Sequence, residues 1–234
     1  RLGEDRRFFS YFHPALEDEP IIFVQVALTK GMGKSIQELM KPSNNDQKKY
    51  DTATFYSISN CQEGLSRVTL GNFLIKRVVY EIQEELPHIK NFGTLSPIPG
   101  FADWFSYLEE SKIKNILGNL TNQNVSFLKS KDMKIGDNRI VENKEAIIRL
   151  VAHYIVNEKN KKGLPLNDVS RFHLGNGAII EDIVINANIS ETGFKRSYGV
   201  MVNYLYELKN IEKNHEDYMN SNKVILSDKI KKYL

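Results

Sequence analysis

The chain has 234 residues, enough for one or two domains with a substantial buried core. Its 41% apolar and 26% charged residues are ordinary for a globular protein, and a formal net charge of +3 is too small to indicate nucleic acid as a partner. No apolar run has the length of a membrane span, so no membrane partner is expected. The single cysteine, Cys61, excludes an internal disulfide and is compatible with a reducing compartment.

Patterns typical of strands and of helices alternate along the first hundred residues. They predict a strand over 21–28, a short helix over 31–40, a strand over 52–59, a helix after residue 70 and a strand over 92–96. Two glycines stand between the strand 52–59 and the helix that follows it. A strand, a glycine-bearing turn and a helix N-terminus together form an anion site, because unpaired backbone N–H groups and the helix dipole point at one spot.

The second half of the chain has the same mixture of elements. It predicts a helix over 101–117, a variable insertion over 118–143, a helix over 144–158, a brief helix through 172–173, strands over 179–185 and 199–208, and a polar tail from residue 210. Because the order lacks a strict βαβ rhythm, the fold class is predicted to be α+β or mixed α/β. Neither a dinucleotide-binding glycine fingerprint nor a P-loop is present.

Two polar residues stand out as candidates for chemistry. His173 lies beside the tight turn Gly175-Asn176-Gly177, where a backbone can approach a ligand closely, and histidine is well suited to proton transfer near neutral pH. The alternative is a histidine that only fastens the loop. Ser96 ends a predicted strand ahead of two prolines, which makes it either a preorganised donor or a hydroxyl that caps the turn. The five histidines show no metal-ligand spacing, so no metal site is expected, and His215 in the polar tail is expected to be exposed.

Five separate sequence blocks stand in a recognisable order along the chain. They are Phe55-Tyr56-Ser57-Ile58-Ser59, Leu70-Gly71-Asn72-Phe73-Leu74, Leu95-Ser96-Pro97-Ile98-Pro99-Gly100-Phe101, Arg171-Phe172-His173-Leu174-Gly175-Asn176-Gly177 and Gly199-Val200-Met201-Val202-Asn203-Tyr204. Together they resemble malonyl-CoA decarboxylase over most of residues 6–218. The resemblance implies that residues 1–234 form a catalytic domain with a GNAT-like, acetyltransferase-type fold: a central mixed sheet flanked by helices. The all-helical domain that precedes it in the family, and on which a homo-oligomer would rely, is expected to be absent.

The resemblance also implies the roles of individual residues. The family's catalytic serine and histidine fall on Ser96 and His173. Its coenzyme A phosphate loop falls on Ser66, Arg67, Val68, Thr69, Leu70, Gly71 and Asn72. Thr69 stands where some members have a glutamate, so no role of that carboxylate is carried over. We expect Ser57 and Tyr204 to line the acyl pocket.

The implied reaction converts malonyl-CoA to acetyl-CoA and carbon dioxide without a metal or an organic cofactor, coenzyme A being part of the substrate. Loss of carbon dioxide leaves electrons on a thioester enolate, so donors aimed at the thioester oxygen lower the barrier, and a histidine with a near-neutral pKa then supplies a proton. Two alternatives stay open: a GNAT-type acyltransferase that uses coenzyme A, and a non-catalytic acyl-CoA-binding module. The C-terminal Lys232-Tyr233-Leu234 is no peroxisomal address, so the expected location is a bacterial cytoplasm, or alternatively mitochondria.

Overall fold

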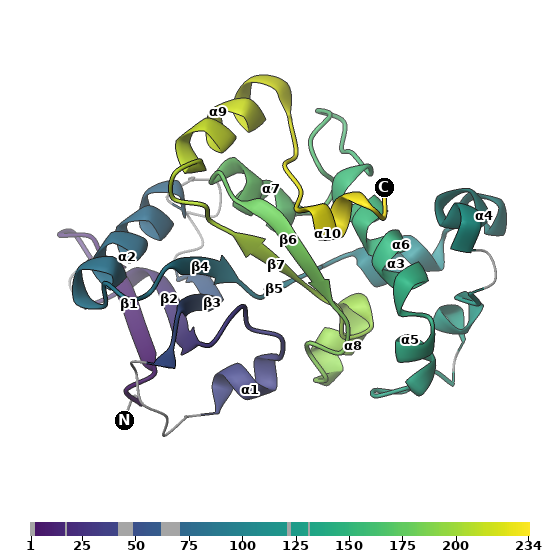
Figure 1. The fold of residues 1–234 in the computed structure, drawn as a ribbon, viewed down its shortest axis with the longest axis horizontal. Coiled ribbons are helices and arrows are strands. Elements are labelled where there is room, and N and C mark those ends of the chain that lie inside the picture. Colours follow the sequence, from purple (N-terminus) through teal and green to yellow (C-terminus); the bar gives the residue numbers. More distant parts are fainter. Residues whose placement is uncertain (1–2, 17, 42–48, 62–70, 121–122, 131) are drawn as a thin grey trace.

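A computed structural model shows a seven-stranded mixed sheet with helices around it, which confirms the mixed α/β fold class (Figure 1). The structure describes residues 3–16, 18–41, 49–61, 71–120, 123–130 and 132–234. Its strands are β1 (Arg6–Phe12), β2 (Pro20–Thr29), β3 (Thr52–Asn60), β4 (Asn91–Thr94), β5 (Ser96–Pro97), β6 (Ile179–Val184) and β7 (Met201–Leu205).

The sheet has the order β1-β2-β3-β4-β7-β5, and β6 also pairs with β7. β3 and β4 pair in parallel, whereas the other pairs are antiparallel. β4 and β5 both lie along β7, one after the other, with Leu95 between them. The middle of the sheet is therefore a single interrupted strand paired with β7.

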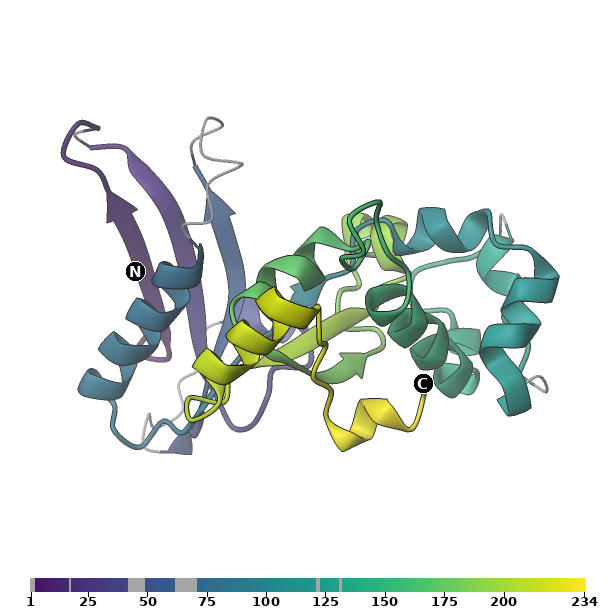
Figure 2. The same cartoon turned by 90° about the horizontal axis from the view of Figure 1, so that it is seen from above.

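The strands diverge at the interruption. The β3–β4 pairs end at Phe55 and Thr94, and the next residue, Leu95, donates its N–H to the carbonyl of Phe55 at 3.0 Å. β3 then continues alongside β2 as far as the pair of Asn60 with Ile22. Seen from above, β3 and β7 separate by a wide angle beyond this point (Figure 2). Among the described residues, the last residues of β3 and those of β5 are thus not paired with each other.

The helices vary from one turn to four. They are α1 (Ile36–Met40), α2 (Gly71–Glu85), α3 (Phe101–Ser106), α4 (Glu110–Leu117), α5 (Asn138–Glu142), α6 (Lys144–Val156), α7 (Asp168–Gly175), α8 (Glu191–Ser197), α9 (Ile211–Ser221) and α10 (Asp228–Lys231). Helices α6, α7 and α10 pack on β6, and α9 packs on α7. Two short 3-10 helices occupy 118–120 and 126–129.

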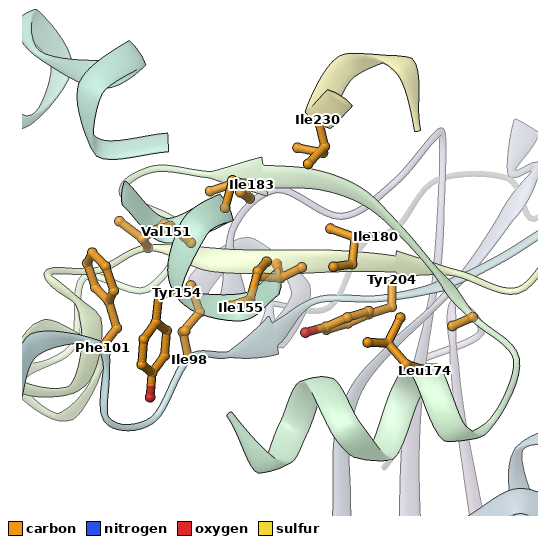
Figure 3. Packing of buried hydrophobic residues seen from close by; sticks show 14 of the residues in the cluster. Ile98, Phe101, Val151, Tyr154, Ile155, Leu174, Ile180, Ile183, Tyr204 and Ile230 are labelled. Carbon is orange, nitrogen blue, oxygen red and sulfur yellow. The ribbon is translucent and has the colours of Figure 1, made fainter. Parts of the chain in front are cut away.

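The main core lies between the sheet and these helices. α6 buries apolar side chains at helical spacing, among them Val151, Tyr154 and Ile155, which is the pattern of a helix with one face against a sheet. Figure 3 shows Val151 and Ile155 on the side of α6 towards Ile183 and Ile180 of β6, and Tyr154 beside Phe101 and Ile98. A smaller cluster, which includes Leu39, Leu95 and Met201, fills the opposite face of the sheet below α1.

Some of the expected features differ from the observed ones. The helix expected over 101–117 is two helices, α3 and α4, separated by residues 107–109. The expected variable insertion 118–143 contains the two 3-10 helices and α5, and β1 adds a strand before the first one expected. The polar tail contains the three-turn helix α9. His215 on α9 is partly buried, with its Nδ1 2.6 Å from the carbonyl oxygen of Gly175, so the expectation that it is exposed was wrong.

Candidate active site

Ser96 and Thr94 present their hydroxyl groups on the same face of the sheet. Side chains two residues apart along an extended chain point the same way, so Leu95 between them turns to the opposite face and joins the small core cluster. The Ser96 hydroxyl donates a hydrogen bond to Oγ1 of Thr94 at 2.8 Å. Both side chains are buried, Ser96 at 5% exposure and Thr94 at 1%.

β7 supplies two tyrosines to this face by the same two-residue alternation. Tyr204 stacks on the imidazole of His173, with ring centroids 4.4 Å apart and planes inclined by 26°. Tyr206 follows the strand, and its hydroxyl lies 2.8 Å from Nδ1 of His173. The other ring nitrogen, Nε2, lies 2.9 Å from Oγ of Ser96. The structure therefore brings the two predicted catalytic residues, 77 positions apart in the chain, into direct contact.

Helix α7 holds His173 over the sheet. Asn167 caps the helix by accepting the backbone N–H of Ser170 at 2.8 Å, and its side-chain amide donates to the carbonyl of Pro99 at 2.9 Å. Ser170 lies one helical turn before His173 on the same face, and its hydroxyl is 2.8 Å from that of Tyr204. The start of the helix is thus bonded to the turn that follows Ser96, which ties the positions of the two catalytic candidates together.

The turn after Ser96 requires a glycine at its end. Gly100 has a φ of +81°, and a Cβ there would lie 2.7 Å from the hydroxyl of Tyr154. That hydroxyl donates to the carbonyl of Pro99 at 3.1 Å. Glycine adopts positive φ without steric cost, so the sequence Pro99-Gly100 can turn sharply into α3 while Tyr154 holds the turn in place.

The other face of β7 fixes the backbone of the site. Asn203 points away from His173, and its side-chain amide donates to the carbonyls of Thr94 at 2.8 Å and of Gly33 at 2.9 Å. Asn203 is buried, so both bonds form away from water and fix β4, β7 and the loop after β2 relative to one another.

Burial sets the charge state of the site. Desolvation lowers the pKa of His173 from 6.5 to about 3, because the buried imidazolium would lose its hydration. Burial likewise raises the pKa of Tyr206 well above its usual range. The imidazole is therefore neutral and the phenol protonated at neutral pH. This corrects the expectation of a histidine with a near-neutral pKa: the group available for donation is the N–H of an uncharged ring.

The residues predicted for the acyl pocket and for the phosphate loop lie in several places. Ser57 lies on the part of β3 that extends beyond its pairs with β4. Gly71 opens α2 and Asn72 follows it. The other residues of the expected phosphate loop lie outside the described part of the chain: Ser66, Arg67, Val68, Thr69 and Leu70. Tyr204 is fully buried against His173, so the structure places it in the wall that supports the histidine. Figure 3 shows its ring between β7 and Leu174 of α7.

Sequence reasoning missed three residues that contact the catalytic pair or its supports: Thr94, Ser170 and Tyr206. All three carried a signal in the sequence. Thr94 stands two residues before Ser96, and Tyr206 stands two residues after Tyr204, so strand alternation alone places each on the same face as a residue already singled out. Ser170 precedes His173 by three residues on a predicted helix, which is the spacing of neighbours on one helical face.

The chain is similar in sequence and in structure to proteins of known family. The family described as the malonyl-CoA decarboxylase C-terminal domain matches residues 1–234. The chain belongs to the malonyl-CoA decarboxylase family. It is 36% identical to the mitochondrial malonyl-CoA decarboxylase of Anser anser anser and 35% identical to that of Rattus norvegicus. These alignments cover 98% of the chain but 50% and 51% of the two relatives, so the chain spans about half the length of the curated relatives it matches.

Solved structures of malonyl-CoA decarboxylases show the same fold. The enzyme from Rhodopseudomonas palustris is 38% identical, with a TM-score of 0.82, over 99% of this chain and 53% of that one. The enzyme from Cupriavidus metallidurans is 37% identical, with a TM-score of 0.83, over 100% of this chain and 60% of that one. The likeness to these two structures therefore covers nearly the whole chain.

The described residues contain neither a membrane-spanning helix nor a cluster of metal ligands. None of the helices among them combines the length and the apolar composition that crossing a bilayer requires. Within the same residues, no three His, Cys, Asp or Glu side chains come together in a group that could hold a metal ion.

Proposed function

We propose that this chain decarboxylates malonyl-CoA, giving acetyl-CoA and carbon dioxide, as the names of its relatives indicate for them. The observation that supports this most strongly is the buried contact of 2.9 Å between Ser96 Oγ and His173 Nε2, at the point where the sheet opens. It joins a hydrogen-bonding group and a proton donor in one place, which is what breaking a carbon–carbon bond next to a thioester requires.

The proposed reaction has two steps. The bond between the α-carbon and the carboxylate breaks, carbon dioxide leaves, and the electron pair moves into the thioester as an enolate. His173 then donates a proton from Nε2 to the α-carbon, which gives acetyl-CoA, and the ring regains a proton from water after the product leaves. Each turnover consumes one proton. Ser96 holds and polarises the malonyl carboxylate, which replaces Thr94 as the acceptor of the Ser96 hydroxyl hydrogen when substrate binds.

Burial of the site favours the first step. Ser96 and His173 are 5% and 3% exposed, so a malonyl carboxylate bound beside the pair would lose most of its hydration. A carboxylate is costly in a dry site, whereas neutral carbon dioxide is not, so desolvation favours the departure of carbon dioxide. The same exclusion of water protects the enolate until His173 protonates it.

The opening between β3 and β5 is the proposed entry for the thioester arm of coenzyme A. Extended backbone there, from Tyr56 to Asn60, is free of β4 and can bond an amide-bearing chain in the manner of an added strand. The phosphates are proposed to bind residues 66–72, on the sequence resemblance alone. The reaction is proposed to need no metal and no organic cofactor. The proposed location remains a bacterial cytoplasm, with mitochondria as the alternative.

Turnover and binding measured separately test these roles. Ser96→Ala and His173→Gln are expected to lower kcat by roughly 10²–10⁴-fold while the Kd for acetyl-CoA, measured by calorimetry, changes little. Ser106→Ala is the matched control, because that hydroxyl is exposed and donates only to the carbonyl of Asp103. Equal losses of binding and turnover in the site variants would instead indicate that the pair is structural and would favour a non-catalytic acyl-CoA-binding module.

A further inference from the structure

Thr94 accepts hydrogen bonds from two different strands. Its Oγ1 accepts the hydroxyl of Ser96 at 2.8 Å and the backbone N–H of Tyr204 at 3.3 Å. The side chain is 1% exposed, and Asn203 fixes the Thr94 carbonyl from the opposite face. Thr94 is therefore held rigidly as an acceptor within reach of Ser96.

This acceptor determines the direction of the hydrogen bonds around the histidine. A serine hydroxyl has one hydrogen, and that of Ser96 is directed at Thr94. Towards His173 the oxygen can then only accept, so Nε2 must carry the ring proton. In a neutral imidazole the other nitrogen is bare, and Nδ1 accepts the hydroxyl of Tyr206 at 2.8 Å. In this arrangement the bonds from Ser96 to Thr94, from His173 to Ser96 and from Tyr206 to His173 each have one donor and one acceptor.

We propose that Thr94 is a positioning residue that keeps the proton of His173 on Nε2, the nitrogen beside Ser96. This inference rests on the proposed function, in which Nε2 is the atom that protonates the α-carbon. Without the Thr94 acceptor, the hydrogen of Ser96 turns toward Nε2 and the ring proton moves to Nδ1, where it donates to the oxygen of Tyr206. The histidine then carries its proton on the side away from Ser96 and the substrate.

Nitrogen NMR of the neutral histidine distinguishes the two arrangements. In ¹⁵N-histidine-labelled protein at pH 7, Nε2 of His173 is expected to show the shift of a protonated nitrogen and Nδ1 that of a bare one. Thr94→Val is expected to exchange the two signals and to lower kcat on the order of 10²-fold or more, with KM little changed, because a misplaced ring proton is costly in catalysis. Thr94→Ser keeps the acceptor and is expected to restore both the signals and kcat.

A control and a clear contrary result complete the test. Thr54→Val also removes a buried hydroxyl, one that bonds Thr29 at the end of β2 and the N–H of Gly33 in the loop after it. This change is expected to leave the His173 signals unchanged. A proton on Nδ1 in the unmodified protein, or one that stays on Nε2 in folded Thr94→Val, would overturn the role of Thr94. The NMR signals need no turnover, so absence of decarboxylation in the unmodified protein would refute the proposed function separately.

Discussion

The buried imidazole of His173 predicts a specific loss of stability in mild acid. Its pKa is about 3 in the folded protein and 6.5 when the chain is unfolded, so the unfolded chain binds more protons between these values. Stability contributed by the neutral buried ring is complete above pH 6.5 and is lost as the pH falls from 6.5 toward 3. From pH 7 to pH 5 the loss amounts to about 2 kcal/mol, and at most about 1.4 kcal/mol is lost per pH unit.

Urea unfolding at pH 7 and pH 5, followed by the fluorescence of Trp104, measures this loss. The unmodified chain is expected to lose about 2 kcal/mol more between the two pH values than His173→Gln, whose amide offers a donor and an acceptor but does not titrate. Burial also lowers the pKa of His153, though this side chain is partly exposed, so His153→Gln is expected to remove a smaller share of the pH dependence. Identical losses in the unmodified chain and His173→Gln would refute the neutral, buried histidine.

Two further substitutions test the framework of the site. Gly177→Ala places a Cβ 2.1 Å from the carbonyl oxygen of Ile211, at a φ of +79°. Its free energy of unfolding is therefore expected to fall by roughly 2–4 kcal/mol. Gly136→Ala is the control, because Gly136 has the same φ of +79° with open space around it, and it is expected to lose about 1 kcal/mol. Equal losses would contradict the close contact. Asn203→Ala leaves two buried carbonyls without their donor, so its free energy of unfolding is expected to fall by roughly 2–4 kcal/mol. The exposed Asn210→Ala is the control and is expected to lose less than about 0.5 kcal/mol. Comparable losses for the two variants would show that the buried amide bonds do not contribute to stability.

Local patterns predicted those elements whose buried residues are apolar. The strand around Val24 and the helix around Val151 were found because their periodicity is strong. α9 was missed because one of its three buried positions is Asn214, and the rest of the helix is polar. The break between α3 and α4 was missed because the buried residue Leu108 continues the apolar pattern across it.

The candidate site shows a similar limit. The catalytic roles predicted for Ser96 and His173 came from resemblance to a family, since no local pattern connects residues so distant in the chain. Their charge state could not be predicted, because the depression of the His173 pKa is caused by burial under α7 and the two tyrosines, which only the assembled fold provides. Thr94 acquires its role in the same way, from strands that meet only in the folded sheet.

The most direct test of the proposed function is the product balance of the purified chain with malonyl-CoA, with no acyl acceptor and no added metal. We expect one carbon dioxide and one acetyl-CoA for each malonyl-CoA consumed, and loss of both products in His173→Gln. Malonyl-CoA that binds but stays intact, or equal product formation by His173→Gln, would contradict decarboxylation by the Ser96–His173 pair.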